Sequence, residues 1–197
     1  MVTIAVKDTL VTGQELFRIN CAGCHGINKE GKLPTFPPLV NIQQRLSKEQ
    51  IHYQIKNGKG LMPSLGHLSD AKINAITAYL FNEPQQQITI KNFTPVELGR
   101  NLVTSNCISC HRLTVNDPVP ANAKAMCSMM KPAPFSETTK RFTKVEFQNI
   151  LLMGSCYMPS FDFLTAADKD AVWAYLKTLE GKNELQVKKK SKMCSMM

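Results

Sequence analysis

Cys21-Ala22-Gly23-Cys24-His25 has a second copy further along the chain, Cys107-Ile108-Ser109-Cys110-His111. Both copies read C-x-x-C-H, which is the attachment signal for c-type haem. Two residues between the cysteines place both sulfur atoms on one turn of helix, where they can bond the two vinyl groups of one porphyrin. The histidine that follows is then held under the iron as a ligand. The pattern predicts two covalently attached haem c groups, bonded by Cys21, Cys24, Cys107 and Cys110 and ligated by His25 and His111.

Disulfide bonds, or one zinc site made of four cysteines, are the alternatives to haem. A zinc site would leave both histidines without a role, and cysteine pairs 86 positions apart are unusual in a compact zinc module. Met-Pro-Ser also follows each copy at a similar distance, at residues 62–64 and 158–160. The paired features favour haem.

The two halves of the sequence repeat each other. Matching residues lie 96 positions apart: Arg45 with Arg141, Met62 with Met158, and Tyr79 with Tyr175. The haem cysteines are only 86 positions apart, so the second half carries about ten extra residues between His111 and Pro134. A repeat of this length indicates two copies of one domain. We expect a first domain at 1–86, a second at 87–182 with an insertion near 117–131, and a basic tail at 183–197 ending in Met-Cys-Ser-Met-Met.

The segments between these motifs are predicted to be helices. Apolar residues at helical spacing follow N-terminal capping patterns, in which a serine or threonine precedes an acidic residue or glutamine by three positions. The patterns begin at Thr12, Ser47, Thr94, Thr143 and Thr165, and a further helix begins at Ser69. Gly58 and Gly154 are placed to end two of the helices. The fold class expected is all-α.

With these motifs the chain resembles a dihaem cytochrome c made of two class I cytochrome c domains, over about residues 10–181. In that family a few helices surround one haem, with a histidine below the iron, a methionine above it, and a proline carbonyl that orients the imidazole. The resemblance implies axial ligation by His25, Met62, His111 and Met158, with pocket support from Pro38 and Pro134. One departure is Arg112, which stands where the first half has Gly26 and is expected to alter only the local turn.

Other roles are open for some of the proposed ligands. Met62 and Met158 could be ordinary core methionines, but both precede Pro-Ser at matching positions of the repeat, which favours iron ligation. His52 and His67 are rival ligands for the first iron. The second half has no histidine at either matching position, so the methionines are preferred.

Three cysteines, Cys127, Cys156 and Cys194, remain after haem attachment. Met-Cys-Ser-Met-Met occurs twice, at 126–130 and 193–197. A disulfide that joins Cys127 to Cys156 or to Cys194 is the first interpretation. Of the two pairings we expect Cys127 with Cys156, which leaves Cys194 as a thiol. A copper(I) site built from cysteine and methionine is one alternative. A reactive thiol at Cys156 beside the second haem is another.

The charge favours acidic partners. Lys and Arg number 24 against 15 Asp and Glu, which gives a formal charge of +9. No nucleic-acid-binding motif accompanies it, so we expect acidic redox proteins or a membrane-associated oxidase or reductase complex as partners. No apolar run approaches the roughly 20 residues of a transmembrane helix. Covalent haem attachment normally takes place outside the bacterial cytoplasm, so we expect a periplasmic protein whose signal peptide is absent from this numbering.

These expectations combine into one function. The chain is predicted to transfer electrons between periplasmic or membrane-associated partners of a respiratory chain and to carry out no catalysis of its own. The alternative is a haem enzyme or enzyme subunit acting on sulfur compounds, like the dihaem thiosulfate dehydrogenases, with Cys156 near the second haem. Those enzymes carry a cysteine ligand where this chain offers Met62.

Overall fold

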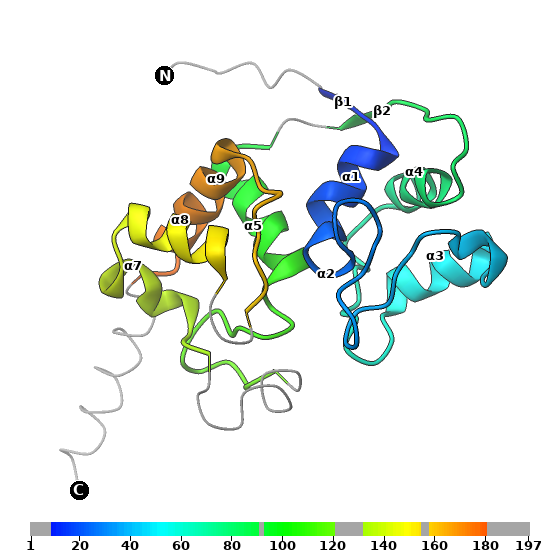
Figure 1. The fold of residues 1–197 in the computed structure, drawn as a ribbon. Coiled ribbons are helices and arrows are strands. Elements are labelled where there is room, and N and C mark those ends of the chain that lie inside the picture. The colour runs from blue at the N-terminus through cyan, green and yellow to red at the C-terminus, as the bar shows by residue number, and fades with distance from the viewer. Residues whose placement is uncertain (1–8, 91–92, 121–131, 155–157, 181–197) are drawn as a thin grey trace, which may run out of the picture. The chain divides into compact units, whose positions relative to one another are not determined.

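The structure is a computed structural model that describes residues 9–90, 93–120, 132–154 and 158–180. The chain forms two compact units, Met1–Thr94 and Pro95–Met197 (Figure 1). From the sequence, the boundary was expected after residue 86. The structure places it after Thr94, because residues 88–90 form a strand that pairs within the first unit.

The first unit contains β1 (Thr9–Val11), α1 (Gly13–Asn20), α2 (Ala22–His25), the 3₁₀ helix η1 (Ile42–Gln44), α3 (Lys48–Asn57), α4 (Asp70–Leu80) and β2 (Ile88–Ile90). Strands β1 and β2 pair antiparallel, with Thr9 opposite Ile90 and Val11 opposite Ile88 (Figure 1). This ribbon was not predicted. Each strand has three residues, which is too short for the alternation of apolar and polar residues that identifies a strand in a sequence.

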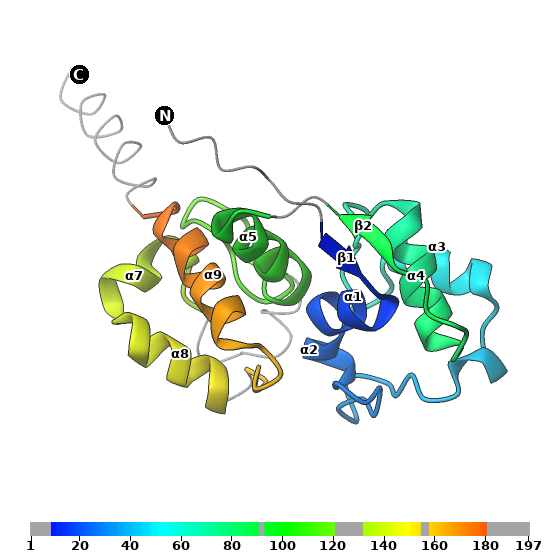
Figure 2. The same ribbon diagram turned by 90° about the horizontal axis from the view of Figure 1, so that it is seen from above.

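The second unit contains α5 (Pro95–Asn106), the 3₁₀ helix η2 (Phe135–Glu137), α7 (Thr138–Arg141), α8 (Lys144–Met153) and α9 (Ala166–Lys177). Figure 2 shows α5 and α9 packed side by side. The predicted all-α class is confirmed, with the small ribbon as an addition. Within the described ranges, no helix combines the length and the apolar character needed to cross a bilayer.

Reciprocal capping fixes the starts of three helices where the sequence predicted them. The boxes join Ser47 to Gln50 at α3, Thr143 to Glu146 at α8, and Thr165 to Asp168 at α9. In each box the hydroxyl accepts from one backbone N–H, and the side chain three residues later accepts from the other. Gly58 and Gly154 then end α3 and α8 with φ of 76° and 71°, a conformation that favours glycine.

The capping box predicted at α1 is only half formed. The Thr12 hydroxyl accepts from the backbone N–H of Glu15 at 3.3 Å. The Glu15 carboxylate binds the Arg18 guanidinium, at 2.7 Å, in place of the Thr12 backbone. Salt bridges between residues three apart on a helix compete in this way with capping, because both use the same carboxylate.

In each unit a glycine lies where the first helix meets the last one, α1 against α4 in the first unit and α5 against α9 in the second. A Cβ added to Gly13 of α1 would overlap the carbonyl oxygen of Ala75 in α4, and one added to Gly99 of α5 would overlap that of Ala171 in α9. The obstacle is backbone in both cases, so it cannot rotate away. Glycine therefore permits the close approach that buries the neighbouring side chains, including Phe17 in the first unit and Val103 in the second.

Candidate haem sites

Each C-x-x-C-H motif forms one turn directly after the first helix of its unit, α1 or α5. The backbone N–H of His25 donates to the carbonyl of Cys21 at 3.0 Å, and that of His111 donates to the carbonyl of Cys107 at 2.8 Å. All four motif cysteines are thiols in the structure. Burial, with a smaller contribution from the neighbouring Cys24, raises the pKa of Cys21 to about 12. Two thiols on one turn are the arrangement that two-point attachment of a porphyrin requires.

The histidine of each motif is oriented by a backbone carbonyl. Nδ1 of His25 lies 2.9 Å from the carbonyl oxygen of Pro37, and Nδ1 of His111 lies 3.2 Å from that of Ala133. A carbonyl oxygen only accepts, so Nδ1 carries the hydrogen and Nε2 keeps the lone pair needed to bind iron. The same arrangement therefore occurs in both units.

The acceptors differ by one residue from those predicted. Pocket support was expected from Pro38 and Pro134, whereas the carbonyls that reach the histidines belong to Pro37 and Ala133. The carbonyl of Pro38 instead accepts from the Arg45 guanidinium at 2.6 Å. Because Pro37 and Pro38 are adjacent, the sequence does not show which of their two carbonyls reaches the histidine. The second unit shows that the acceptor need not be a proline.

Both histidines are held in a site that favours the neutral imidazole. Burial lowers the pKa of His25 and of His111 below the ordinary histidine value, and the hydrogen bonds to the carbonyls oppose this more weakly. Neutral imidazole is the form that coordinates metals. Phe135 stacks on the His111 ring, with the centroids 4.7 Å apart. This contact restrains the ring of the second site.

The predicted methionine ligands lie on loops that fold back against the ends of α3 and α8. A Cβ added to Gly58 would lie 2.6 Å from the carbonyl oxygen of Met62, and one added to Gly154 would lie 2.5 Å from that of Met158. Both methionines are half-buried. Iron ligation by Met62 and Met158 stays a prediction, now with matching backbone geometry in the two units.

The side chain of Gln54 contacts the first of these methionines. Its Nε2 lies 3.7 Å from Sδ of Met62, within hydrogen-bonding range for sulfur. Gln54 was not predicted from the sequence. Only its position eight residues before Met62 and on the last turns of α3 could have indicated it.

The rival histidines lie elsewhere. His52 is two positions before Gln54 on α3, which turns its side chain to a different face of the helix. Its Nε2 lies 3.4 Å from the Asp70 carboxylate. His67 is exposed, and partial burial with the nearby Lys72 lowers its pKa. Neither geometry indicates an iron ligand.

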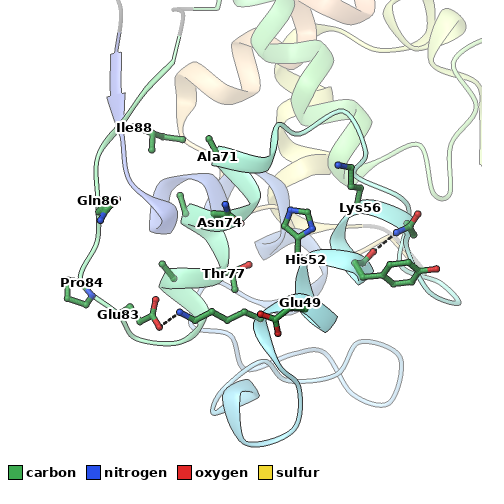
Figure 3. Close-up of a pocket in the computed structure, with 15 residues that line it drawn as sticks. Glu49, His52, Lys56, Ala71, Asn74, Thr77, Glu83, Pro84, Gln86 and Ile88 are labelled. Carbon is green, nitrogen blue, oxygen red and sulfur yellow. Dashed lines mark hydrogen bonds and ion pairs between the residues drawn. The ribbon is translucent and has the colours of Figure 1, made fainter.

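A cavity of about 1000 Å³ lies on the first unit between α3, α4 and the segment leading to β2 (Figure 3). Its lining includes His52 but none of the residues predicted to bind haem. In the second unit Trp173 of α9 packs on Phe147 of α8, with the ring centroids 5.4 Å apart. The residue of the first unit that matches Trp173 in the repeat is Thr77 of α4. Thr77 is one of the residues that line the cavity, and the cavity is separate from the residues predicted to bind haem.

The donors in each unit fit haem iron. A pair of thiols and an imidazole with its Nδ1 occupied match the attachment and ligation chemistry of haem c, and the thioether of Met62 or Met158 in the same unit would supply the predicted soft ligand. Cys127, Cys156 and Cys194 lie outside the described residues. Their predicted disulfide, copper and reactive-thiol roles therefore stay predictions.

The sequence matches the family described as "Cytochrome C oxidase, cbb3-type, subunit III" twice, over residues 8–80 and 94–176. Similar proteins include the cytochrome bc1 complex cytochrome c subunit of Mycobacterium leprae (strain TN), 26% identical over 137 residues that make up 57% of this chain and 45% of that protein. The same subunit of Mycobacterium tuberculosis (strain ATCC 25618 / H37Rv) is 26% identical over 157 residues, 64% of this chain and 54% of the relative. Cytochrome c6 of Tetradesmus obliquus is 35% identical over 80 residues, 38% of this chain and 90% of that protein.

The chain thus spans about half the length of the mycobacterial relatives that it matches. The two matches of the family to one chain agree with two tandem domains. Together the similarities support covalently bound haem c and electron transfer in general. They give no support to the alternative of a thiosulfate dehydrogenase-like enzyme.

Proposed function

Because the chain belongs to the cytochrome c family described as cytochrome c oxidase, cbb3-type, subunit III, we propose that it is a dihaem electron-transfer protein. The observation that carries the proposal is the repeated site. In each unit the histidine of the motif, His25 or His111, lies on one helical turn with its two cysteines, and a backbone carbonyl accepts from its Nδ1. One haem c would be bonded by Cys21 and Cys24, and the other by Cys107 and Cys110. With Met62 and Met158 as second ligands, neither iron has an open position for a substrate, which favours one-electron transfer over catalysis.

The proposed partner is a membrane-associated complex of the respiratory chain. The mycobacterial relatives are named as subunits of a cytochrome bc1 complex, which supports a complex of that type. The formal charge of +9 favours an acidic docking face on the partner. The compartment proposed is the periplasm, because covalent haem attachment normally takes place outside the cytoplasm.

The number of haems is tested first, on protein produced together with a cytochrome c maturation system. Two haems per chain should remain bound after denaturation and acid-acetone washing. Cys24→Ser and Cys110→Ser should each remove one thioether bond, which mass spectrometry of haem peptides can locate. One haem or none in the wild type would contradict the proposal.

Electron transfer is tested with the holoprotein and a quinol-reduced cytochrome bc1 complex. The chain should be reduced by the complex, and the rate should fall as ionic strength rises through about 0.1 M, where the screening length is about 10 Å. Reduction by thiosulfate alone is the comparison reaction. If thiosulfate reduced the chain and the complex did not, the proposal of an enzyme that acts on sulfur compounds would replace the proposal of an electron carrier.

A further inference from the structure

The cavity between α3, α4 and the segment leading to β2 is large enough to hold a small molecule. Its volume of about 1000 Å³ is at the upper end of the range for such sites, and its wall is mostly apolar. One side is a face of α4 on which small residues recur at helical spacing, Ala71, Ala75 and Ala78. Thr77, which is 4% exposed, is the most deeply buried residue of the lining. The proposed electron transfer gives none of these residues a role.

In the second unit the same pair of helices holds an aromatic ring. Trp173 of α9 packs on Phe147 of α8. The matching residues of the first unit are Thr77 of α4 and Ile51 of α3, so neither position carries an aromatic side chain there. One copy of the domain thus accommodates a ring between these helices, and the other copy has a cavity at its helix pair. The contrast indicates an aromatic ring as the group that the cavity would accept.

The polar links between the two helices also differ. Asp170 of α9 pairs with Lys144 of α8 at 2.9 Å. The residue of α4 that matches Asp170 is Asn74, which lines the cavity (Figure 3). The matching lysine, Lys48, pairs instead with Glu83, beyond the end of α4. The cavity is therefore offered an amide, which can donate a hydrogen bond to a ligand or accept one from it.

The lining of the cavity carries no net charge. It includes two lysines and two glutamates, Lys48, Lys56, Glu49 and Glu83. Lys48 pairs with Glu83, and Lys56 pairs with Asp70 at 2.9 Å. An anion would lose its hydration on entry and find both lysines of the lining already paired, which makes its transfer costly. Glu49 is exposed, so water screens its attraction for a cation. The cavity therefore favours an uncharged ligand.

Helix α3 joins the cavity to the loop that carries Met62. The hydroxyl of Ser64 donates to the carbonyl of Lys56 at 2.6 Å, and the backbone N–H of Leu65 donates to the carbonyl of Ile55 at 2.9 Å. Lys56 also lines the cavity. A ligand that holds α3 against α4 would therefore also hold the end of the helix to which the Met62 loop is bonded.

We propose that the cavity binds an uncharged aromatic molecule with a hydrogen-bonding group, such as a phenol, and that the bound molecule steadies the Met62 loop through α3. The alanine face of α4 and Thr77 form the apolar wall for the ring, and Asn74 supplies the hydrogen bond. Because Met62 is the predicted ligand of the first iron, an occupied cavity would act on the first haem, and this last step rests on the function proposed above.

Binding is tested by titrating isotope-labelled ferrous holoprotein with p-cresol and following the backbone amide signals in NMR spectra. The probe should shift the signals of α3 and α4 saturably, with half-saturation at about 1 mM, a modest affinity for so small a ligand. Benzoate and benzylammonium carry the same ring with a negative or a positive charge, and should bind roughly tenfold or more weakly. Shifts spread over both units, or equal affinity for the three compounds, would overturn the proposal.

Two variants that fill the cavity locate the site. Thr77→Trp gives the first unit the residue type of Trp173 and should abolish the p-cresol shifts. Ala71→Trp changes an exposed position of the lining, so it covers the cavity without altering the core, and should also abolish them. Ala167→Trp is the matched control at the equivalent exposed position of α9, and should bind p-cresol as the wild type does. Wild-type affinity in both cavity variants, or an equal loss in the control, would overturn the assignment of the cavity as the site.

Hydrogen exchange tests the link to the Met62 loop. The Leu65 amide bonds the Ile55 carbonyl, and in the second unit the matching Phe161 amide bonds the Leu151 carbonyl at 2.7 Å. Saturating p-cresol should slow exchange of the Leu65 amide about threefold to tenfold and leave that of Phe161 unchanged. An unchanged rate at Leu65, or equal slowing at both amides, would overturn the link through α3.

These measurements use ferrous holoprotein without a redox partner. Failure of p-cresol to bind would therefore overturn the ligand site and leave the proposed electron carrier in place. Failure of the chain to accept electrons from the cytochrome bc1 complex would overturn the electron carrier and leave the ligand site in place.

Discussion

Gly99 of α5 lies against the carbonyl oxygen of Ala171 in α9, so closely that any side chain on residue 99 would overlap that oxygen. The same relationship joins Gly13 to Ala75 in the first unit. It brings together segments separated by more than sixty residues, and these segments form the scaffold from which each C-x-x-C-H turn continues. The first prediction follows from this contact.

Gly99→Ala should destabilise the second unit. The added methyl group meets backbone atoms, so the helices must separate, and overpacking of this kind typically lowers the free energy of unfolding by about 1–3 kcal/mol. Chemical denaturation of the holoprotein, followed at the haem absorption band and by circular dichroism, measures the change. Asn101→Ala, at a half-buried position of the same helix, is the control and should change stability by much less. Equal stability of the two variants would contradict the packing argument.

Gly58→Ala should weaken methionine ligation in the first unit. Residue 58 has φ of 76°, and its Cβ would lie 2.6 Å from the Met62 carbonyl oxygen, so the loop must move. Gly60→Ala is a matched control, since φ is also positive, at 60°, but no atom lies within 4 Å of the added Cβ. The red band of methionine-ligated ferric haem should lose the contribution of the first site in Gly58→Ala alone. If both variants lost the contribution of the first site to the red band, the effect would be due to backbone strain and not to contact with the Met62 loop.

Met62→His and Met158→His should each lower the potential of one haem. Imidazole in place of a thioether favours ferric iron, because the softer sulfur ligand stabilises the ferrous state. Separate reporters for the two haems should show that each substitution acts on its own site. If His67→Ala removed the low-spin spectrum of the first site while Met62→Ala kept it, the ligand assignment would be wrong.

Thr143→Ala should destabilise the start of α8 by about 1 kcal/mol. The threonine hydroxyl accepts from the Glu146 backbone N–H at 3.3 Å, and the substitution leaves that N–H without its cap. Thr143→Ser keeps the hydroxyl and should retain most of the stability. The free energy of unfolding of the two variants, measured under the same conditions, checks the prediction. An alanine variant as stable as the serine variant would show that the cap contributes nothing here.

The sequence by itself determined the features that depend on neighbouring residues. The C-x-x-C-H turns, the capping boxes at Ser47 and Thr143, and the glycines that end α3 and α8 are all formed within about one helical turn. The repeat predicted two domains of one kind, because matching motifs recur at fixed separations. These signals were sufficient for the fold class and for the cysteines and histidines of each candidate site.

Only the tertiary structure decided which segments meet. It showed that the carbonyls at the two histidines belong to Pro37 and Ala133, at twelve and twenty-two residues' distance along the chain. It also paired β1 with β2, which moved the domain boundary, and placed the Gln54 amide on the Met62 sulfur. The physical reason is the same in each case. Such contacts depend on how helices and loops pack in three dimensions, and a shift of one residue in a loop changes the partner while leaving the local pattern of the sequence unchanged.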